Sequence, residues 1–280
     1  ICGKVLMKKL SESFSFGGKQ LVYSHYSEVN DCDMKFAIFL PPLETKAPVL
    51  WYLSGLTCSH QNVMEKGEYR KKAAELGMVL ICPDTSPRGD NVPDEKDNWQ
   101  FGSGAGFYVD ATSAPYNKNY NMYSYITKEL PELIEENFNF DMSRQSIFGH
   151  SMGGHGALVM ALRNSTKYKS CSAFAPIVEP MSASWSNDAF IKYIGPDRSN
   201  WELYDSVSLV KNGYTFPEIL IDQGEADDFL NEGLRPWLFS KACENTSINL
   251  QLRMQPNYDH SYYFISTFME EHLVWHRQRI

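Results

Sequence analysis

Short continuous runs of apolar residues recur along the chain and alternate with longer stretches of helical periodicity. Runs without internal alternation are typical of strands that are buried on both faces of a parallel sheet. We expect such strands at Val49–Leu53, Met78–Cys82, Ser146–His150, Cys171–Ala175, Glu218–Asp222 and Ile248–Met254. Helices are predicted at Asn62–Leu76, Tyr123–Phe138, Met152–Arg163, Phe229–Cys243 and Tyr262–Ile280. This alternation of strand and helix predicts an α/β fold around a mainly parallel sheet.

Several local signals refine this pattern. The β-rich stretches Leu21–Tyr26 and Met34–Leu40 predict a hairpin at the edge of the sheet. Gly77 is a suitable C-terminal cap for the helix before it, whereas Pro131 argues against an unbroken helix around it. The segment Asp84–Thr112 is rich in Gly, Pro and Asp, and long loops of this kind inside compact domains are usually functional.

Composition supports one globular domain over residues 1–280. Of the 280 residues, 43% are hydrophobic and 21% are charged, as in ordinary soluble proteins. The net charge of −8 argues against binding to nucleic acids or anionic membranes. The longest apolar runs are too short to span a bilayer. We interpret residues 1–6, which are too short for a signal peptide, as an expression remnant or a disordered extension before Met7.

The six cysteines are scattered along the chain. No CxxC pair and no Cys/His cluster at zinc-ligand spacing is present. In a chain of this size we expect reduced, mostly buried thiols, a cytoplasmic location and no metal site.

A nucleophile motif stands where the pattern predicts a strand followed by a helix. Gly149-His150-Ser151-Met152-Gly153 matches G-x-S-x-G in the strand–turn–helix context that this motif requires. The turn holds the serine in a strained backbone conformation, so that only small neighbours leave room around it. The motif therefore predicts Ser151 as the nucleophile of an α/β-hydrolase fold.

The base should be a histidine after Ser151, since this fold orders its triad as serine, acid and histidine. His260 lies in a polar loop between the last predicted strand and helix, which is the best placement. His155 lies one turn along the helix that Ser151 begins and should point away from the base position. His272 and His276, four residues apart, are interpreted as part of a solvated helix face.

The acid should follow a strand between the serine and the histidine. Asp222, Glu225, Asp227 and Asp228 are the candidates in this region. Asp222 is expected to end the strand, and spacing alone does not choose between Asp227 and Asp228. The oxyanion hole should combine the N–H groups of Met152 and of Leu56, which follows an early strand and the turn residue Gly55.

Five segments, in order, together resemble one known family. They are Tyr52–Cys58, Asp84–Gly89, Gly104–Thr112, Gly149–Leu158 and Tyr258–Phe264. Each is similar to the corresponding segment of the S-formylglutathione hydrolases, also called esterase D. The resemblance implies hydrolysis of the thioester S-formylglutathione to formate and glutathione, without a metal or organic cofactor, by a cytoplasmic homodimer engaged in formaldehyde removal.

The resemblance also assigns roles within the site. The family pattern Asp-Gln-Gly followed two residues later by the catalytic Asp selects Asp227. The resemblance implies that the Leu56 and Met152 N–H groups hold the oxyanion and that Cys58 lies beside the active site.

A formyl substrate requires a cramped acyl pocket and, for glutathione, local positive charge. Trp185 is a candidate wall of the pocket, although it could equally be a packing residue, and Arg88 or Lys66 could meet the carboxylates of glutathione. The main alternative is a broad-specificity short-chain carboxylesterase with the same triad. A non-catalytic binding protein is disfavoured because all triad candidates are present, and a lipase because no long apolar lid is found.

Overall fold

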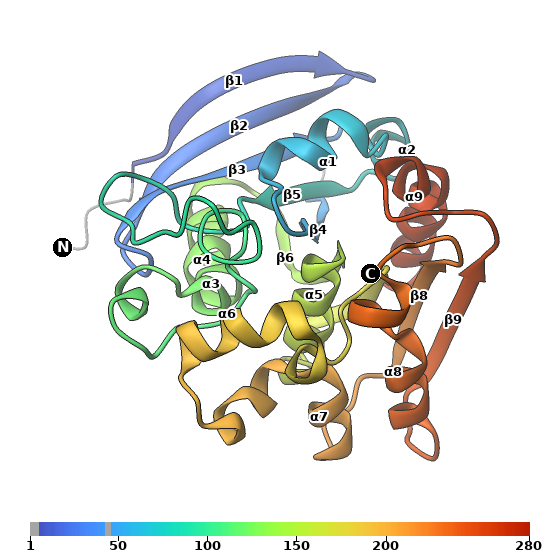
Figure 1. The fold of residues 1–280 in the computed structure, drawn as a ribbon. Coiled ribbons are helices and arrows are strands. Elements are labelled where there is room, and N and C mark those ends of the chain that lie inside the picture. Colours follow the sequence, from blue (N-terminus) through green and yellow to red (C-terminus); the bar gives the residue numbers. More distant parts are fainter. Residues whose placement is uncertain (1–5, 43–45) are drawn as a thin grey trace.

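The computed structural model describes residues 6–42 and 46–280, and these contain a sheet of nine strands. Most of the expected six-residue N-terminal extension, residues 1–5, lies outside the described residues. In sheet order the strands are β1 (Lys8–Ser15), β2 (Gly18–Ser27), β3 (Cys32–Leu40), β5 (Val79–Pro83), β4 (Pro48–Leu53), β6 (Asp141–His150), β7 (Tyr168–Phe174), β8 (Glu218–Gly224) and β9 (Asn249–Gln255). Figure 1 shows β1 and β9 at opposite edges of the sheet.

The sheet has an antiparallel edge and a parallel body. The pairs β1–β2, β2–β3 and β3–β5 are antiparallel, and every later pair is parallel. All residues of β4 and β5 are buried, as the continuous apolar runs predicted. The α/β-hydrolase fold class with its mostly parallel sheet is therefore confirmed.

Helices cover both faces of the sheet. Their bounds are α1 (His60–Lys66), α2 (Arg70–Leu76), α3 (Met122–Ser124), α4 (Leu130–Asn137), α5 (Met152–Arg163), α6 (Ser184–Ile194), α7 (Ser206–Lys211), α8 (Pro236–Cys243) and α9 (Tyr262–Arg277). Side chains alternate between faces along β7, so that Cys171 contacts α5 through the Ala157 carbonyl while Ser172 contacts α9 through His272. Helices α5 and α9 therefore pack on opposite faces.

Several elements differ from the pattern-based predictions. The single helix expected over Asn62–Leu76 is divided into two. Helix α1 ends at Lys66 with Gly67 as its cap, and α2 begins at Arg70. Gly77 caps α2 in the left-handed region, as predicted (φ +64°). Strand β1 was not predicted, because its largely exposed residues carry no buried periodicity.

The two predicted helices that contain prolines also depart from a regular α-helix. Around Pro131 the chain is helical throughout, and α3 passes through a π-helical turn, Tyr125–Glu129, into α4. Pro131 lies in the first turn of α4, directly after the π-helical turn, where the regular pattern of i to i−4 hydrogen bonds is already interrupted. The stretch Phe229–Cys243 contains a π-helical turn and then α8, separated by Arg235 in the left-handed region (φ +47°).

The prediction for His272 and His276 was wrong, since both side chains are fully buried between α9 and the sheet. Ser172 Oγ lies 2.8 Å from both His272 Nδ1 and His276 Nε2, and His272 Nε2 lies 2.9 Å from Asp222 Oδ2. Burial lowers the pKa of both histidines. Burial acts to raise the pKa of Asp222, but hydrogen bonds from His272 and Arg253 hold it well below its usual range.

Two further findings concern the chain as a whole. Across residues 6–42 and 46–280, no helix combines the length and apolar character needed to cross a membrane. The five cysteines in the same ranges, Cys32, Cys58, Cys82, Cys171 and Cys243, are all free thiols, and three of them are buried.

Candidate active site

The carboxyl ends of four parallel strands bring together the segments that carry the predicted site residues. Strand β4 leads into Leu56, β6 into Ser151, β8 into Asp227 and β9 into His260. Because these strands are parallel, their carboxyl ends share one edge of the sheet, where α/β proteins place their sites. Segments more than 200 residues apart in the chain therefore meet at this edge.

Ser151 is held in a strained turn between β6 and α5. Its backbone angles are φ +57° and ψ −117°, a combination that non-glycine residues rarely adopt. The neighbours must be glycines: a Cβ on Gly149 would come within 2.4 Å of the Gly153 carbonyl oxygen, and one on Gly153 within 1.9 Å of the Leu53 carbonyl oxygen. The Ser151 N–H donates to the Phe174 carbonyl at 2.9 Å, which ties the turn to β7.

Ser151, His260 and Asp227 form a continuous hydrogen-bonded chain. Ser151 Oγ lies 3.0 Å from His260 Nε2, and His260 Nδ1 lies 2.6 Å from Asp227 Oδ2. Asp227 also accepts hydrogen bonds from Gln223 Nε2 at 3.1 Å and from the Phe229 N–H at 2.9 Å. These contacts fix the carboxylate, which in turn can orient the imidazole with Nε2 facing the serine hydroxyl.

The structure distinguishes the acidic residues that spacing left open. Asp227 is buried against His260, whereas Asp228 and Glu225 are exposed. Asp222 lies within β8 and does not end it, and its carboxylate pairs with Arg253 and His272 on the face covered by α9.

The Gly55–Leu56 turn lies directly against Ser151. A Cβ on Gly55 would come within 3.1 Å of Ser151 Cβ, which is a tight contact, so the backbone at this point closely approaches the serine. As the first residue of α5, Met152 has no intrahelical acceptor for its N–H. In the described part of the chain the Leu56 N–H donates no hydrogen bond either. Both groups could therefore donate to an oxygen atom beside Ser151.

The long loop predicted to be functional braces this turn. Tyr108 Oη donates to the Ser54 carbonyl at 2.8 Å, and the Thr57 N–H donates to the Gly104 carbonyl at 2.9 Å. His155 Nε2 lies 2.8 Å from the Phe107 carbonyl, so this histidine holds the loop from the far side of α5. The loop positions the turn without itself contacting the serine.

Cys58 and Arg88 lie behind the same turn. The Cys58 carbonyl accepts hydrogen bonds from Thr85 Oγ1 at 2.6 Å and Arg88 Nη2 at 3.1 Å. Arg88 also pairs with both carboxylate oxygens of Asp84, at 2.9 and 3.0 Å. Burial raises the pKa of the Cys58 thiol, and the positive charges of Lys66 and Arg88 oppose this effect.

Trp185 is joined to His260 through one more aromatic ring. Its ring centroid lies 5.2 Å from that of Phe229, which lies 5.1 Å from that of His260. A Cβ on Gly233 would come within 1.7 Å of Trp185, so the indole packs against the loop that follows Asp227. The two rings thus form a wall near the histidine, and sequence reasoning did not find Phe229.

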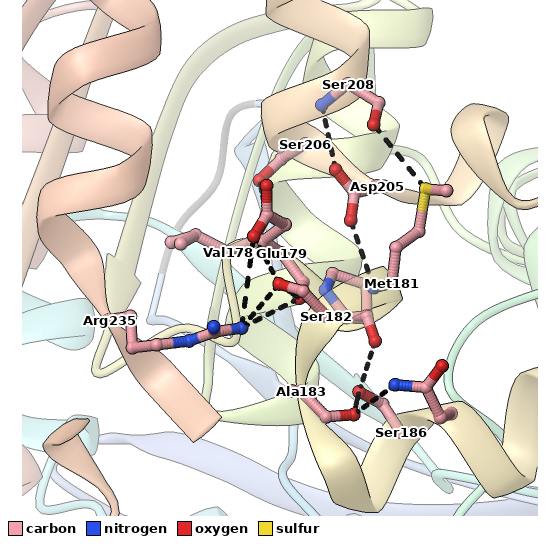
Figure 2. Close-up of polar contacts among 12 residues, drawn as sticks. Val178, Glu179, Met181, Ser182, Ala183, Ser186, Asp205, Ser206, Ser208 and Arg235 are labelled. Carbon is pink, nitrogen blue, oxygen red and sulfur yellow. Dashed lines mark hydrogen bonds and ion pairs between the residues drawn. The ribbon is translucent and has the colours of Figure 1, made fainter. Parts of the chain in front are cut away.

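A polar cluster holds the segment that carries Trp185 in place. Figure 2 shows Arg235 reaching Glu179 and Ser182, with Arg235 Nη2 2.7 Å from Ser182 Oγ and 4.0 Å from a Glu179 carboxylate oxygen. In the same view Asp205 accepts the Met181 N–H at 3.2 Å and the Ser208 N–H at 2.8 Å. The cluster connects α6 to α7 and to the loop after Asp227.

His150 is a second residue that sequence reasoning did not single out. Its buried ring lies 4.4 Å from the His260 ring, and neither ring nitrogen has a partner among the described residues. Burial, and then the neighbouring His260, keep the pKa of His150 well below its usual value, so the ring is neutral. The sequence feature that could have pointed to His150 is its position directly before Ser151.

Comparison with known proteins identifies the family. The family described as "Putative esterase" matches residues 27–275. The S-formylglutathione hydrolase of Bos taurus is 54% identical over 275 residues, with 96% of this chain and 97% of that protein covered. The chain belongs to the S-formylglutathione hydrolase family. Its plant relative from Arabidopsis thaliana is 47% identical over 279 residues, covering 98% of each chain.

Solved structures agree with this assignment. The S-formylglutathione hydrolase from Agrobacterium tumefaciens is 62% identical, with a TM-score of 0.96 and coverage of 97% of this chain and 99% of that one. A ferulic acid esterase, 20% identical with a TM-score of 0.74 and coverage of 95% and 100%, shares the fold alone. The family resemblance seen in the five sequence segments is therefore confirmed.

Proposed function

We propose that this protein hydrolyses S-formylglutathione to formate and glutathione through a formyl-serine intermediate. The observation that carries the proposal is the hydrogen-bonded chain from Ser151 through His260 to Asp227, found in a chain about half of whose residues are identical to enzymes with this name. The proposed biological role is formaldehyde catabolism in the cytoplasm. We further propose a homodimer, which light scattering would test.

The proposed acylation step uses the triad and the turn beside it. Ser151 Oγ attacks the formyl carbon while His260 Nε2 takes the hydroxyl proton, and Asp227 stabilises the resulting imidazolium. The Leu56 and Met152 N–H groups hold the developing oxyanion, an effect worth about 3 kcal/mol per donor. The C–S bond then breaks, and glutathione leaves as a thiolate that takes the proton from His260.

Deacylation repeats the same chemistry with water. His260 removes a proton from a water molecule, the resulting hydroxide attacks the formyl ester, and formate leaves as Ser151 regains its proton. Trp185, together with Phe229, limits the acyl side of the site to small groups. Cys58 and Arg88 lie on the oxyanion side, where Arg88 supports the turn through the Cys58 carbonyl.

Steady-state kinetics test the substrate assignment. We expect kcat/KM to be far higher for S-formylglutathione than for p-nitrophenyl acetate, and to fall again for the butyrate ester. Comparable efficiency on butyrate esters would instead support the broad carboxylesterase. Ser151→Ala should abolish hydrolysis of S-formylglutathione and of the p-nitrophenyl esters without unfolding the protein. Residual turnover in that variant would exclude Ser151 as the nucleophile.

A further inference from the structure

A cavity of about 540 Å³ lies beside the segment that directly follows the histidine of the triad. It is lined by Lys66, Glu68, Ser261, Tyr262, Tyr263 and Ser266, which come from the end of α1 and the first turns of α9. Ser261 follows His260 directly in the chain and is the N-cap of α9. The Tyr262 ring also packs 6.2 Å from His150, which itself packs against His260. The cavity wall therefore includes Ser261 and Tyr262, the two residues that directly follow the group that would protonate the leaving thiolate.

Two opposite charges at this cavity have no partner in the folded protein. Within residues 6–42 and 46–280, neither Lys66 nor Glu68 forms an ion pair or a side-chain hydrogen bond. The nearby Lys72, by contrast, pairs with Glu75 at 2.6 Å. Lys66 and Glu68 both line the cavity, and the Lys66 ammonium is close enough to the site to oppose the effect of burial on the Cys58 thiol.

Arg88 is less suited to receive a ligand carboxylate. Its guanidinium is already occupied by Asp84 and by the Cys58 carbonyl. A ligand carboxylate at Arg88 would have to compete with the buried Asp84, whereas Lys66 can bind one without breaking an existing contact.

The remaining lining groups suit a polar peptide. Tyr263 exposes 85% of its surface, which makes it the most exposed aromatic side chain described. An aromatic ring with a hydroxyl group offers a ligand both a flat apolar face and a hydrogen bond. Ser261 and Ser266 add hydroxyl groups at the same cavity.

Resting on the proposed function, we propose that this cavity binds the γ-glutamyl end of the glutathione leaving group. That end carries an α-carboxylate and an α-ammonium on one carbon, so it presents two opposite charges side by side. Lys66 contacts the carboxylate, Glu68 contacts the ammonium, and Tyr263 packs against the chain that joins them to the sulfur. The contacts increase affinity for the thioester and leave small neutral esters unaffected.

The test compares single-charge variants on two substrates. Lys66→Met should raise KM for S-formylglutathione about five-fold, the upper range for an exposed ion pair, and leave kcat within about two-fold. It should not change kcat/KM for p-nitrophenyl acetate. Lys66→Arg should restore KM, and the matched control Lys71→Met, an exposed lysine outside the cavity, should behave as the parent protein.

A second pair of measurements isolates the ammonium contact. N-acetylation of S-formylglutathione removes its ammonium group. The acetylated substrate should have a higher KM with the parent protein and with Lys66→Met, but its KM with Glu68→Gln should equal that of the unmodified substrate. The inference is overturned if Lys66→Met and Lys71→Met have equal effects, or if N-acetylation costs Glu68→Gln as much as the parent. A parent protein that does not prefer S-formylglutathione over p-nitrophenyl acetate would instead overturn the proposed function.

Discussion

At the scale of single residues, the site depends on a few positions at which only one residue type fits. Gly149 and Gly153 must be glycines because a Cβ at either position would collide with backbone atoms. A Cβ on Gly55 would make a tight contact with Ser151. Asp227 is buried, and three polar contacts fix its carboxylate, because His260, Gln223 and the Phe229 N–H all converge on its two oxygens. Position, and not chemistry alone, separates Asp227 from the carboxylate next to it.

Asp227→Asn should lower kcat for p-nitrophenyl acetate by about 10,000-fold, because an amide in place of the carboxylate no longer holds the imidazole in the required tautomer. The matched control is Asp228→Asn, which removes the same charge from the next residue, whose side chain is exposed. Its kcat should remain within about two-fold of the parent, since surface substitutions rarely matter. If both variants lost activity equally, the assignment of the acid would be wrong.

At the scale of elements, polar side chains join α9 to the sheet. His272 and His276 on α9 meet Ser172 on β7, and the His272 ring stacks on Phe174 with centroids 3.9 Å apart. The Phe174 carbonyl accepts the Ser151 N–H. The buried network on the α9 face therefore supports β7, the strand to which the Ser151 turn is hydrogen-bonded.

Ser172→Ala should lower the free energy of unfolding by about 3 kcal/mol, because it leaves nitrogen atoms of two buried histidines without a partner. Urea denaturation followed by circular dichroism would measure the change. Ser13→Ala on the exposed strand β1 serves as the control and should cost less than about 0.5 kcal/mol. A loss below about 1 kcal/mol in Ser172→Ala would show that the histidines find other partners.

Arg235→Met should broaden the acyl range of the enzyme, because Arg235 connects the loop after Asp227 to the segment that carries Trp185 (Figure 2). We expect the ratio of kcat/KM for p-nitrophenyl butyrate to that for the acetate to rise several-fold. The control is Lys211→Met, which also removes a cation 4.0 Å from Glu179 but from an exposed position. An unchanged ratio in Arg235→Met would contradict the proposed role of the cluster.

At the scale of the whole molecule, the folded protein keeps most of its histidines neutral. Burial lowers the pKa of His25, His60, His150, His155, His272 and His276. Among the residues that the structure describes, Asp205 alone shifts in the opposite sense near neutral pH, since burial raises its pKa to about 6. The chain has seven histidines, so titration in the range from pH 7 to pH 5 is dominated by this imidazole set.

Stability should therefore fall as the pH is lowered from 7.5 to 5.5. As the pH falls through about 6.5, the unfolded chain binds more protons at these six histidines than the folded chain does, so protonation favours unfolding by up to about 1.4 kcal/mol per pH unit for each histidine. Asp205 acts in the opposite direction between its ordinary pKa and about 6, because there the folded state holds a proton that the unfolded state releases. The effect of the six histidines on the free energy of unfolding exceeds that of Asp205.

Scanning calorimetry from pH 8 to pH 5 would measure this dependence through the unfolding temperature. His60→Gln removes one of the six groups and should make the decrease of the unfolding temperature with falling pH shallower, by at most one proton. An unfolding temperature that is constant or rises toward pH 5 would contradict the predicted linkage.

The sequence by itself determined the fold class, the strands of the parallel body and the helix Met152–Arg163, because these depend on local periodicity. It also proposed Ser151 and His260, since a nucleophile motif and a loop at a strand end are visible in the chain. These signals are local, and each is contained within one element and its flanking turns.

Only the tertiary structure decided which side chains meet across elements. It placed Asp227 against His260, a choice that spacing left open and that only the family pattern had made from the sequence, and it buried His272 and His276, which were assigned to a solvated face. Residues such as Ser151 and His260 are 109 positions apart, and their 3.0 Å contact depends on how strands and helices pack. Polarity along a helix does not predict burial when a strand offers hydroxyl and carboxylate partners to that face.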